Sequence, residues 1–236
     1  MRMFTVALIG PDGAGKTTLA RRLEGELPLP ARYLYMGVSA DSSSALLPTR
    51  RVLRALKRRL GATPDTAGPP DSTAPDAPPR SYPRRVLASI RALVRVANLL
   101  GDEWYRQLIV WREVRRGVVV IFDRHYFADF FHYDVDARRR RRLDRRIHGF
   151  VLARIYPRPD LVVYLDAPAD VLLARKGEGT LDVLERRRRE YLELDRVIDR
   201  FAVVDAARPA DDVVGDLVSL VTAYAAERGV LGPKAP

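Results

Sequence analysis

The residues with the clearest chemistry lie in one short stretch near the N-terminus. This stretch reads Gly10-Pro11-Asp12-Gly13-Ala14-Gly15-Lys16-Thr17-Thr18. Its spacing is that of the motif G-x-x-x-x-G-K-[ST], in which backbone N–H groups and a helix N-terminus surround a phosphate. In such a loop Lys16 would reach the β- and γ-phosphates, and the Thr17 hydroxyl would bind Mg²⁺. We therefore predict a nucleoside triphosphate site.

The segments on either side of this loop fit the motif. Residues 4–9 form an apolar, β-rich run, and residues 19–27 have a helical pattern that ends before Pro28. The alternative is a Gly-rich turn between a strand and a helix that binds nothing. The complete motif and both flanks favour the phosphate site.

Five strand patterns alternate with helical patterns along the chain. The strands are expected at residues 4–9, 32–36, 118–122, 160–166 and 201–205. This alternation predicts a parallel sheet with right-handed crossovers. Ligands of such sheets bind at the carboxyl ends of the strands, where Asp123 and Arg124 follow the third pattern.

The longest helical pattern covers residues 86–111, with a candidate break at Gly101. Its apolar positions predict one buried face, formed by Val86, Ile90, Leu93, Val94, Ala97 and Leu100. Further helices are expected at 184–200 and 211–227. Residues 61–83 are rich in proline and small polar residues, so we expect a mobile insertion there.

Composition restricts the remaining classes of function. The chain has 236 residues and no cysteine, which suits one α/β domain and excludes disulfides, thiolate zinc sites and cysteine nucleophiles. No apolar run reaches the ~18 residues of a transmembrane helix. The strand pattern at the start leaves no room for a signal peptide. We expect a cytoplasmic protein with no membrane partner.

The net charge of +11 raises the question of a nucleic-acid partner. The densest arginine cluster, residues 138–146, lies in a helical pattern. The apolar positions of that pattern predict a buried face, formed by Leu143, Ile147, Phe150 and Val151. The arginines would then lie on a solvated face, so we expect no nucleic-acid partner.

Taken in this order, the segments resemble the thymidylate kinase family of P-loop nucleoside monophosphate kinases. The resemblance rests on the loop at 10–18, on 117–125, on 159–166 and on the helix that ends at 189–194. It implies a three-layer P-loop kinase fold with a five-stranded parallel sheet of order 2-3-1-4-5. It also implies one domain over residues 1–230 with a short lid at about 175–186. ATP, Mg²⁺ and phosphoryl transfer to a second ligand follow from the same resemblance.

The resemblance also implies roles for individual residues. Asp12 matches an acidic loop position that approaches the sugar hydroxyl of the acceptor. Asp123 matches the acid near the metal, together with Thr17, and Arg124 matches the arginine that holds the acceptor phosphate. The alternative for Asp123 and Arg124 is that they cap a helix and pair with each other.

The lid follows from the residue at position 13. Some members of the family carry an arginine there, and members without it supply one from a lid. Here the residue is Gly13, so Arg175 and Lys176 become the candidate catalytic cations. The alternative is that they form an ordinary solvated helix end.

Two departures from the family leave the acceptor open. After residues 32–36 the Glu/Arg-Pro-Gly-Gly turn of thymidylate kinases is missing. In the central region Arg106 and Gln107 could contact the base and phosphate of the acceptor only if the helix register shifts.

We expect ATP-dependent phosphoryl transfer to an anionic acceptor, most simply a nucleoside monophosphate. The alternatives are a kinase for a sugar or sugar phosphate, and an ATP-binding protein without kinase activity. A homodimer is left open.

Overall fold

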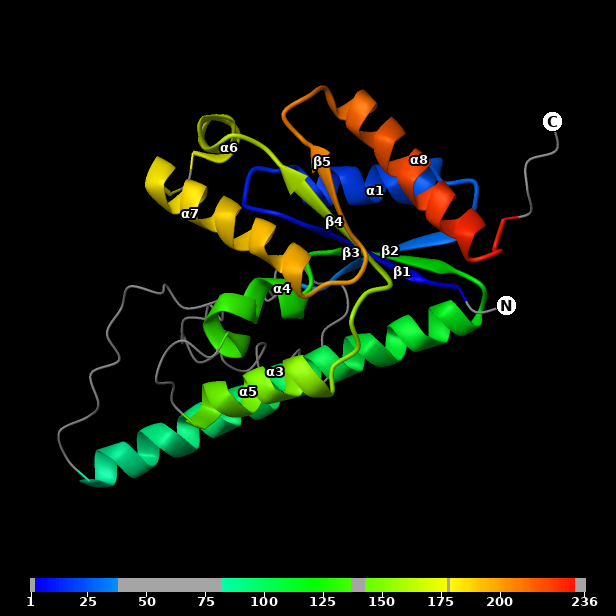
Figure 1. Ribbon diagram of the computed structural model, residues 1–236. Helices are drawn as coiled ribbons and strands as arrows, with labels where there is room; N and C mark the ends of the chain where they lie inside the picture. The colour runs from blue at the N-terminus through cyan, green and yellow to red at the C-terminus, as the bar shows by residue number, and fades with distance from the viewer. Residues whose placement is uncertain (1–2, 38–81, 137–142, 178, 232–236) are drawn as a thin grey trace, which may run out of the picture.

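The computed structural model describes residues 3–37, 82–136, 143–177 and 179–231, and its centre is one parallel sheet (Figure 1). The five strands run in the order β2-β3-β1-β4-β5. They are β1 (Thr5–Ile9), β2 (Ala31–Tyr35), β3 (Val119–Asp123), β4 (Leu161–Asp166) and β5 (Phe201–Asp205). All neighbouring strands pair in parallel. The predicted sheet and its order are confirmed.

The central strands are apolar because both of their faces are covered. Every residue of β1 and β3 is buried, as expected for parallel strands with helices on both sides. In the register of the sheet, Val6 of β1 lies opposite Ile121 on one side and Leu161 on the other. The carboxyl end of β1 therefore lies between the carboxyl ends of β3 and β4.

Helices form a layer on each face of the sheet (Figure 1). They are α1 (Lys16–Glu26), α3 (Tyr82–Arg115), α4 (Tyr126–Phe130), α5 (Leu143–Arg154), α6 (Ala169–Lys176), α7 (Leu181–Leu192) and α8 (Ala210–Glu227). A π-helical turn, η1 (Phe131–Val135), extends α4, and a 3₁₀ turn, η2 (Glu193–Arg196), follows α7. One core lies under α1 and α8, and the other lies between the sheet and α3, α4 and α5. None of the described helices is long and apolar enough to cross a membrane.

The long helix differs from the sequence prediction in two ways. α3 continues through Gly101 without a break. A single glycine costs a helix only about 1 kcal/mol, and the next residues, Asp102 and Glu103, are buried. The predicted buried face is also wrong, because Val86, Ile90 and the neighbouring apolar positions are 40–54% exposed. That half of α3 extends beyond the sheet, and only the second half packs on the core (Figure 1).

The predicted buried face of α5 is also wrong. Leu143 and Phe150 are more than 60% exposed, and Ile147 is exposed as well, whereas His148, Gly149 and Leu152 are buried. α5 turns this other face inward because His148 hydrogen-bonds to Asp134 of η1. Arginines 138–142 lie outside the described residues.

The predicted insertion at 61–83 lies outside the described residues up to position 81. Tyr82 and Pro83 already belong to α3. The last helix, expected at 211–227, is confirmed as α8.

Candidate active site

The predicted phosphate loop connects β1 to α1 at the carboxyl end of the central strand. Gly15 precedes the first turn of α1 with a left-handed φ of 80°. Gly13 has a φ of 92°, and a Cβ at this position would lie 2.6 Å from the carbonyl oxygen of Leu172. Any side chain at position 13 would therefore be strained and would collide with α6. This packing explains why the loop has no arginine at position 13.

Lys16 is buried inside the loop. Its Nζ donates hydrogen bonds to the carbonyl oxygens of Gly10 at 2.8 Å and Pro11 at 2.6 Å. Burial, helped by the nearby Arg124 cation, lowers the pKa of Lys16 to about 7. A phosphate bound in the loop would favour the charged form of this lysine.

Thr17 and Asp123 meet at the ends of α1 and β3. The Thr17 hydroxyl donates a hydrogen bond to Asp123 Oδ2 at 2.5 Å, and the Tyr33 hydroxyl donates to the same oxygen at 3.0 Å. Asp123 Oδ1 is buried and accepts no hydrogen bond from any described residue. An unsatisfied carboxylate oxygen beside a hydroxyl fits Mg²⁺, which prefers hard oxygen ligands. No cluster of three or more His, Cys, Asp or Glu suited to a metal occurs among the described residues. A metal ion here would therefore take its other ligands from phosphates and water.

Arg124 directly follows β3 in a left-handed conformation, with a φ of 71°. This conformation is rare for a residue with a side chain and is typical of strained functional positions. The Arg124 guanidinium forms an ion pair with Asp12 of the loop. Burial alone would lower the pKa of Arg124, but the carboxylates of Asp129 and Asp12 raise it above its usual value. Arg124 is therefore a permanent cation beside the phosphate loop.

Asp12 is surrounded by three cations. Besides Arg124, Lys176 Nζ of α6 lies 3.6 Å from Asp12 Oδ2, and Lys16 Nζ lies 3.8 Å from Oδ1. Burial alone would raise the pKa of Asp12, but these cations together lower it below its usual value. The structure thus brings together six of the residues singled out in the sequence: Asp12, Lys16, Arg124 and Lys176 in this cluster, and the pair of Thr17 and Asp123.

The other three candidates are not part of the cluster around Asp12. Arg175 donates hydrogen bonds to the carbonyl oxygens of Ala206 at 2.7 Å and Ala207 at 3.2 Å, beyond the end of β5. Arg106 is buried and donates to the Gly37 carbonyl at 2.7 Å and to the Tyr126 hydroxyl. Gln107 is buried on α3. Arg106 therefore holds the backbone that contacts Arg124, since a Cβ on Gly37 would lie 2.6 Å from Arg124 Cδ.

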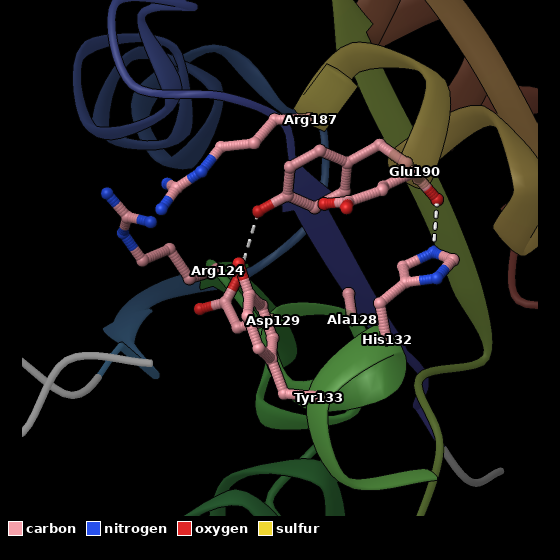
Figure 2. Close-up of a pocket in the computed structure, with 8 residues that line it drawn as sticks. Arg124, Ala128, Asp129, His132, Tyr133, Arg187 and Glu190 are labelled. Atoms are coloured by element: carbon pink, nitrogen blue, oxygen red, sulfur yellow. Dashed lines mark hydrogen bonds between the residues drawn. The ribbon is translucent and has the colours of Figure 1, made fainter. Parts of the chain in front are cut away.

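A pocket opens beside Arg124, between α4 with η1 on one side and α7 on the other (Figure 2). It encloses about 400 Å³, including space open to solvent. It is lined by Arg124, Ala128, Asp129, His132, Tyr133, Arg187, Glu190 and Tyr191. Apart from Arg124, the sequence analysis assigned none of these residues to a site.

Two hydrogen bonds join the opposite walls of this pocket. The Tyr191 hydroxyl donates to Asp129 Oδ1 at 3.1 Å, and His132 Nε2 lies 2.7 Å from the Glu190 carbonyl oxygen (Figure 2).

Arg187 is the member of the run of four arginines on α7 that lines the pocket. Its neighbour Arg188 instead forms two hydrogen bonds with Asp166 at the end of β4, at 2.6 and 2.8 Å. Arg186 lies 4.0 Å from Glu190, and Arg189 donates to the Glu185 carbonyl at 3.4 Å. The run of arginines is visible in the sequence and indicates a basic helix, but only the packing of α7 shows which arginine reaches the pocket.

A phosphate loop on the central strand of a 2-3-1-4-5 parallel sheet, with an Asp-Arg pair ending the adjacent strand, defines a P-loop nucleoside or nucleotide kinase. The family model for thymidylate kinase matches residues 97–217 of this chain. The chain belongs to the thymidylate kinase family, so the resemblance found in the sequence is confirmed.

Known relatives agree with this membership. The chain is 29% identical over 231 residues to the thymidylate kinase of Xanthomonas euvesicatoria pv. vesicatoria, which covers 94% of this chain and 85% of that protein. It is 30% identical over 83 residues to the thymidylate kinase of Thermosipho africanus. That shorter match spans 32% of this chain and 40% of the relative.

Two solved structures share the fold at low sequence identity. Thymidylate kinase from Candida albicans matches with a TM-score of 0.60 and 15% identity, over 94% of this chain and 92% of that one. Deoxyadenosine kinase from M. mycoides, solved with dCMP and dCDP, matches with a TM-score of 0.50 and 16% identity. That match covers 93% of this chain and 99% of the other.

Proposed function

We propose that this chain transfers the γ-phosphoryl group of ATP to the phosphate of a nucleoside monophosphate. The observation that carries the proposal is the position of Arg124. This cation pairs with Asp12 of the phosphate loop and at the same time lines a separate pocket. A donor phosphate bound in the loop and an acceptor phosphate bound in the pocket would therefore lie on either side of Arg124.

The loop would hold the donor through groups that are already in place. Its backbone N–H groups and the N-terminus of α1 would surround the β- and γ-phosphates. Lys16 would exchange its bonds to the Gly10 and Pro11 carbonyls for phosphate oxygens. Thr17 and Asp123 would hold Mg²⁺, which would neutralise charge on the β- and γ-phosphates.

Arg124 would bind the acceptor phosphate through its planar guanidinium, a geometry that lysine does not reproduce. The ion pair between Asp12 and Arg124 would break when the acceptor binds. Asp12 would then lie beside the sugar of the acceptor. Lys176 would supply a further cation near the transferred phosphoryl group, because it already lies near Asp12. Arg175 would reach that group only by leaving its two carbonyl partners at Ala206 and Ala207.

The experiment that tests the proposal measures ADP release with ATP, Mg²⁺ and single candidate acceptors. The candidates are nucleoside monophosphates, nucleosides, sugars and sugar phosphates. We expect the highest kcat/KM with a nucleoside monophosphate, and the two departures from the family leave open which one. A neutral nucleoside or a sugar as the best acceptor would contradict the role of Arg124. Binding of ATP without transfer to any acceptor would indicate a protein without kinase activity.

A further inference from the structure

The acceptor pocket contains a carboxylate that phosphate binding alone does not explain. Asp129 of α4 lines the pocket together with Arg124, and its charge acts on both Arg124 and Lys16. A negative charge this close to a phosphate site weakens the binding of an anion through repulsion. A pocket built only to hold a phosphate would be better without it.

Asp129 is held from the opposite wall and keeps one oxygen free. Its Oδ1 accepts the hydrogen bond from the Tyr191 hydroxyl at 3.1 Å. Its Oδ2 takes part in no hydrogen bond within the described parts of the chain. The carboxylate is only partly buried, because it faces the pocket (Figure 2).

Asp129 acts on Arg124 through its charge but, in the described part of the chain, forms no direct ion pair with it. The ion pair of Arg124 is with Asp12 on the other side, and no ion pair within 4.0 Å joins Arg124 to Asp129 in the described structure. The charges that line the pocket are balanced, with Arg124 and Arg187 against Asp129 and Glu190. This balance suits a ligand that has one anionic end and neutral hydrogen-bond donors elsewhere.

We propose that Asp129, held by Tyr191, is a specificity-determining residue of the acceptor pocket, and that its Oδ2 accepts a hydrogen bond from a hydroxyl or amino group of the acceptor. This inference rests on the proposed function. The acceptor phosphate would lie at Arg124 and Arg187, and its sugar or base would present the donor to Asp129. An acceptor that lacks the donor would leave the carboxylate without a partner, and sites of this kind reject such analogues strongly.

The test compares wild type with Asp129→Asn on matched acceptors. The parent is the best nucleoside monophosphate found for wild type. Its analogues lack one group each, namely the 2′-hydroxyl, the 3′-hydroxyl or the base amino group. In the variant an amide N–H₂ would replace the accepting oxygen, so we expect kcat/KM for the parent to fall about 10- to 100-fold, as for the loss of a charged hydrogen bond. We expect no further loss for the one analogue that lacks the group bound by Asp129.

Tyr191→Phe is the matched control, because it removes the hydrogen bond to Asp129 but keeps the carboxylate. Because the accepting oxygen remains, we expect it to reduce the discrimination between the parent and the analogue that lacks the donor less than Asp129→Asn does. Thermal unfolding shows whether both variants fold. An equal loss in Asp129→Asn for the parent and all analogues, or no loss, would overturn the proposal.

Equilibrium binding of the same nucleotides separates this inference from the proposed function. Binding that depends on Asp129 and on one donor group, without turnover, would support the inference and contradict the kinase activity. If the enzyme turns over, and Asp129→Asn leaves the ratio of the affinities for the parent and for each analogue unchanged, the kinase activity is supported and the inference is overturned.

Discussion

Lys16 combines two properties that make it the most informative single residue of the site. It is buried, and its ammonium group is satisfied by two backbone carbonyls rather than by a carboxylate at close range. In the proposed function, phosphate oxygens would replace these two carbonyls as partners of Lys16. Lys16 is therefore the residue at which the proposed charge stabilisation is most directly tested.

Replacing Lys16 with Ala should lower kcat about 100- to 1,000-fold, the usual cost of losing one preorganised donor to transition-state charge. The fold should survive, because burial already disfavours the charged lysine in the free protein. Steady-state ADP release and thermal unfolding measure both effects. Arg22→Ala on the same helix is the control, since Arg22 forms hydrogen bonds with Glu26 and Asp211 on the surface. A variant that keeps most of its turnover would contradict the proposed role of Lys16.

Arg124→Lys tests the second charged residue of the site. Lysine keeps the positive charge but loses the planar pair of donors. We expect the KM for the acceptor to rise about 10- to 100-fold, as for a lost charged hydrogen bond, with the affinity for ATP nearly unchanged. Initial rates measured while the concentrations of ATP and of the acceptor are each varied give the KM for each substrate separately. A larger effect on ATP than on the acceptor would place Arg124 on the donor side.

At the scale of elements, the packing of α5 on η1 depends on a glycine and a histidine. A methyl group at Gly149 would overlap the carbonyl of Asp134. The adjacent His148 hydrogen-bonds to Asp134 at 2.7 Å and to Glu103 of α3 at 2.9 Å. The two residues thus join α5, η1 and α3.

Gly149→Ala should destabilise the protein by about 1–3 kcal/mol, the usual cost of overpacking, although alanine is the better helix former. Gly215→Ala in α8 is the matched control, because nothing lies within 4 Å of the added methyl group. There we expect a gain of about 0.5–1 kcal/mol. Urea unfolding measures both. Equal effects at the two positions would show that α5 is not held against η1 in this way.

The His148 cluster should make stability depend on pH. Burial alone would lower the pKa of His148, but hydrogen bonds and charges from Asp134 and Glu103 raise it to about 9. Because the folded state binds the proton more tightly than the unfolded state, this stabilisation is complete below about pH 6.5. It is lost as the pH rises toward 9, by up to about 3 kcal/mol.

The measurement is the free energy of unfolding between pH 6 and 9.5, for wild type and His148→Gln. The comparison is needed because Lys16, whose pKa is lowered, has the opposite slope above pH 7. We expect the advantage of wild type over the variant to shrink as the pH rises. A constant difference would mean that His148 is not charged in the folded protein.

At the scale of the whole molecule, the site is assembled from segments that the sheet brings together. The loop follows β1, Arg124 follows β3, and α7 supplies the far wall of the pocket after β4. The phosphate loop is joined to the pocket by Arg124, which pairs with Asp12 of the loop and lines the pocket. Donor and acceptor should therefore bind side by side in one chain.

An analogue in which adenosine and the acceptor nucleoside are joined through a phosphate chain tests this arrangement. It should raise the melting temperature more than ATP or the acceptor alone at the same concentration. A ligand at 100 times its Kd stabilises by about 2.7 kcal/mol, and a tighter ligand by more. Thermal unfolding with each ligand measures the shift. A shift no larger than that of ATP alone would contradict adjacent sites.

Patterns that extend over a few neighbouring residues were sufficient to predict much of the fold and part of the candidate site. The phosphate loop, the five strands and the Asp123-Arg124 pair could be predicted because each depends on neighbouring residues and on the rule that ligands bind at the carboxyl ends of parallel strands. The sheet order and the family followed from resemblance. Sequence patterns failed for α3 and α5, because periodicity locates an apolar face but not the element that covers it.

Only the tertiary structure decided which side chains share the pocket beside Arg124. Successive residues of a helix differ by about 100° in direction, so the run at 186–189 contains one arginine that lines the pocket and one that binds Asp166. Asp129 and Tyr191 are 62 residues apart. Their contact depends on the positions of α4 and α7 on the sheet, and packing over the whole chain determines those positions.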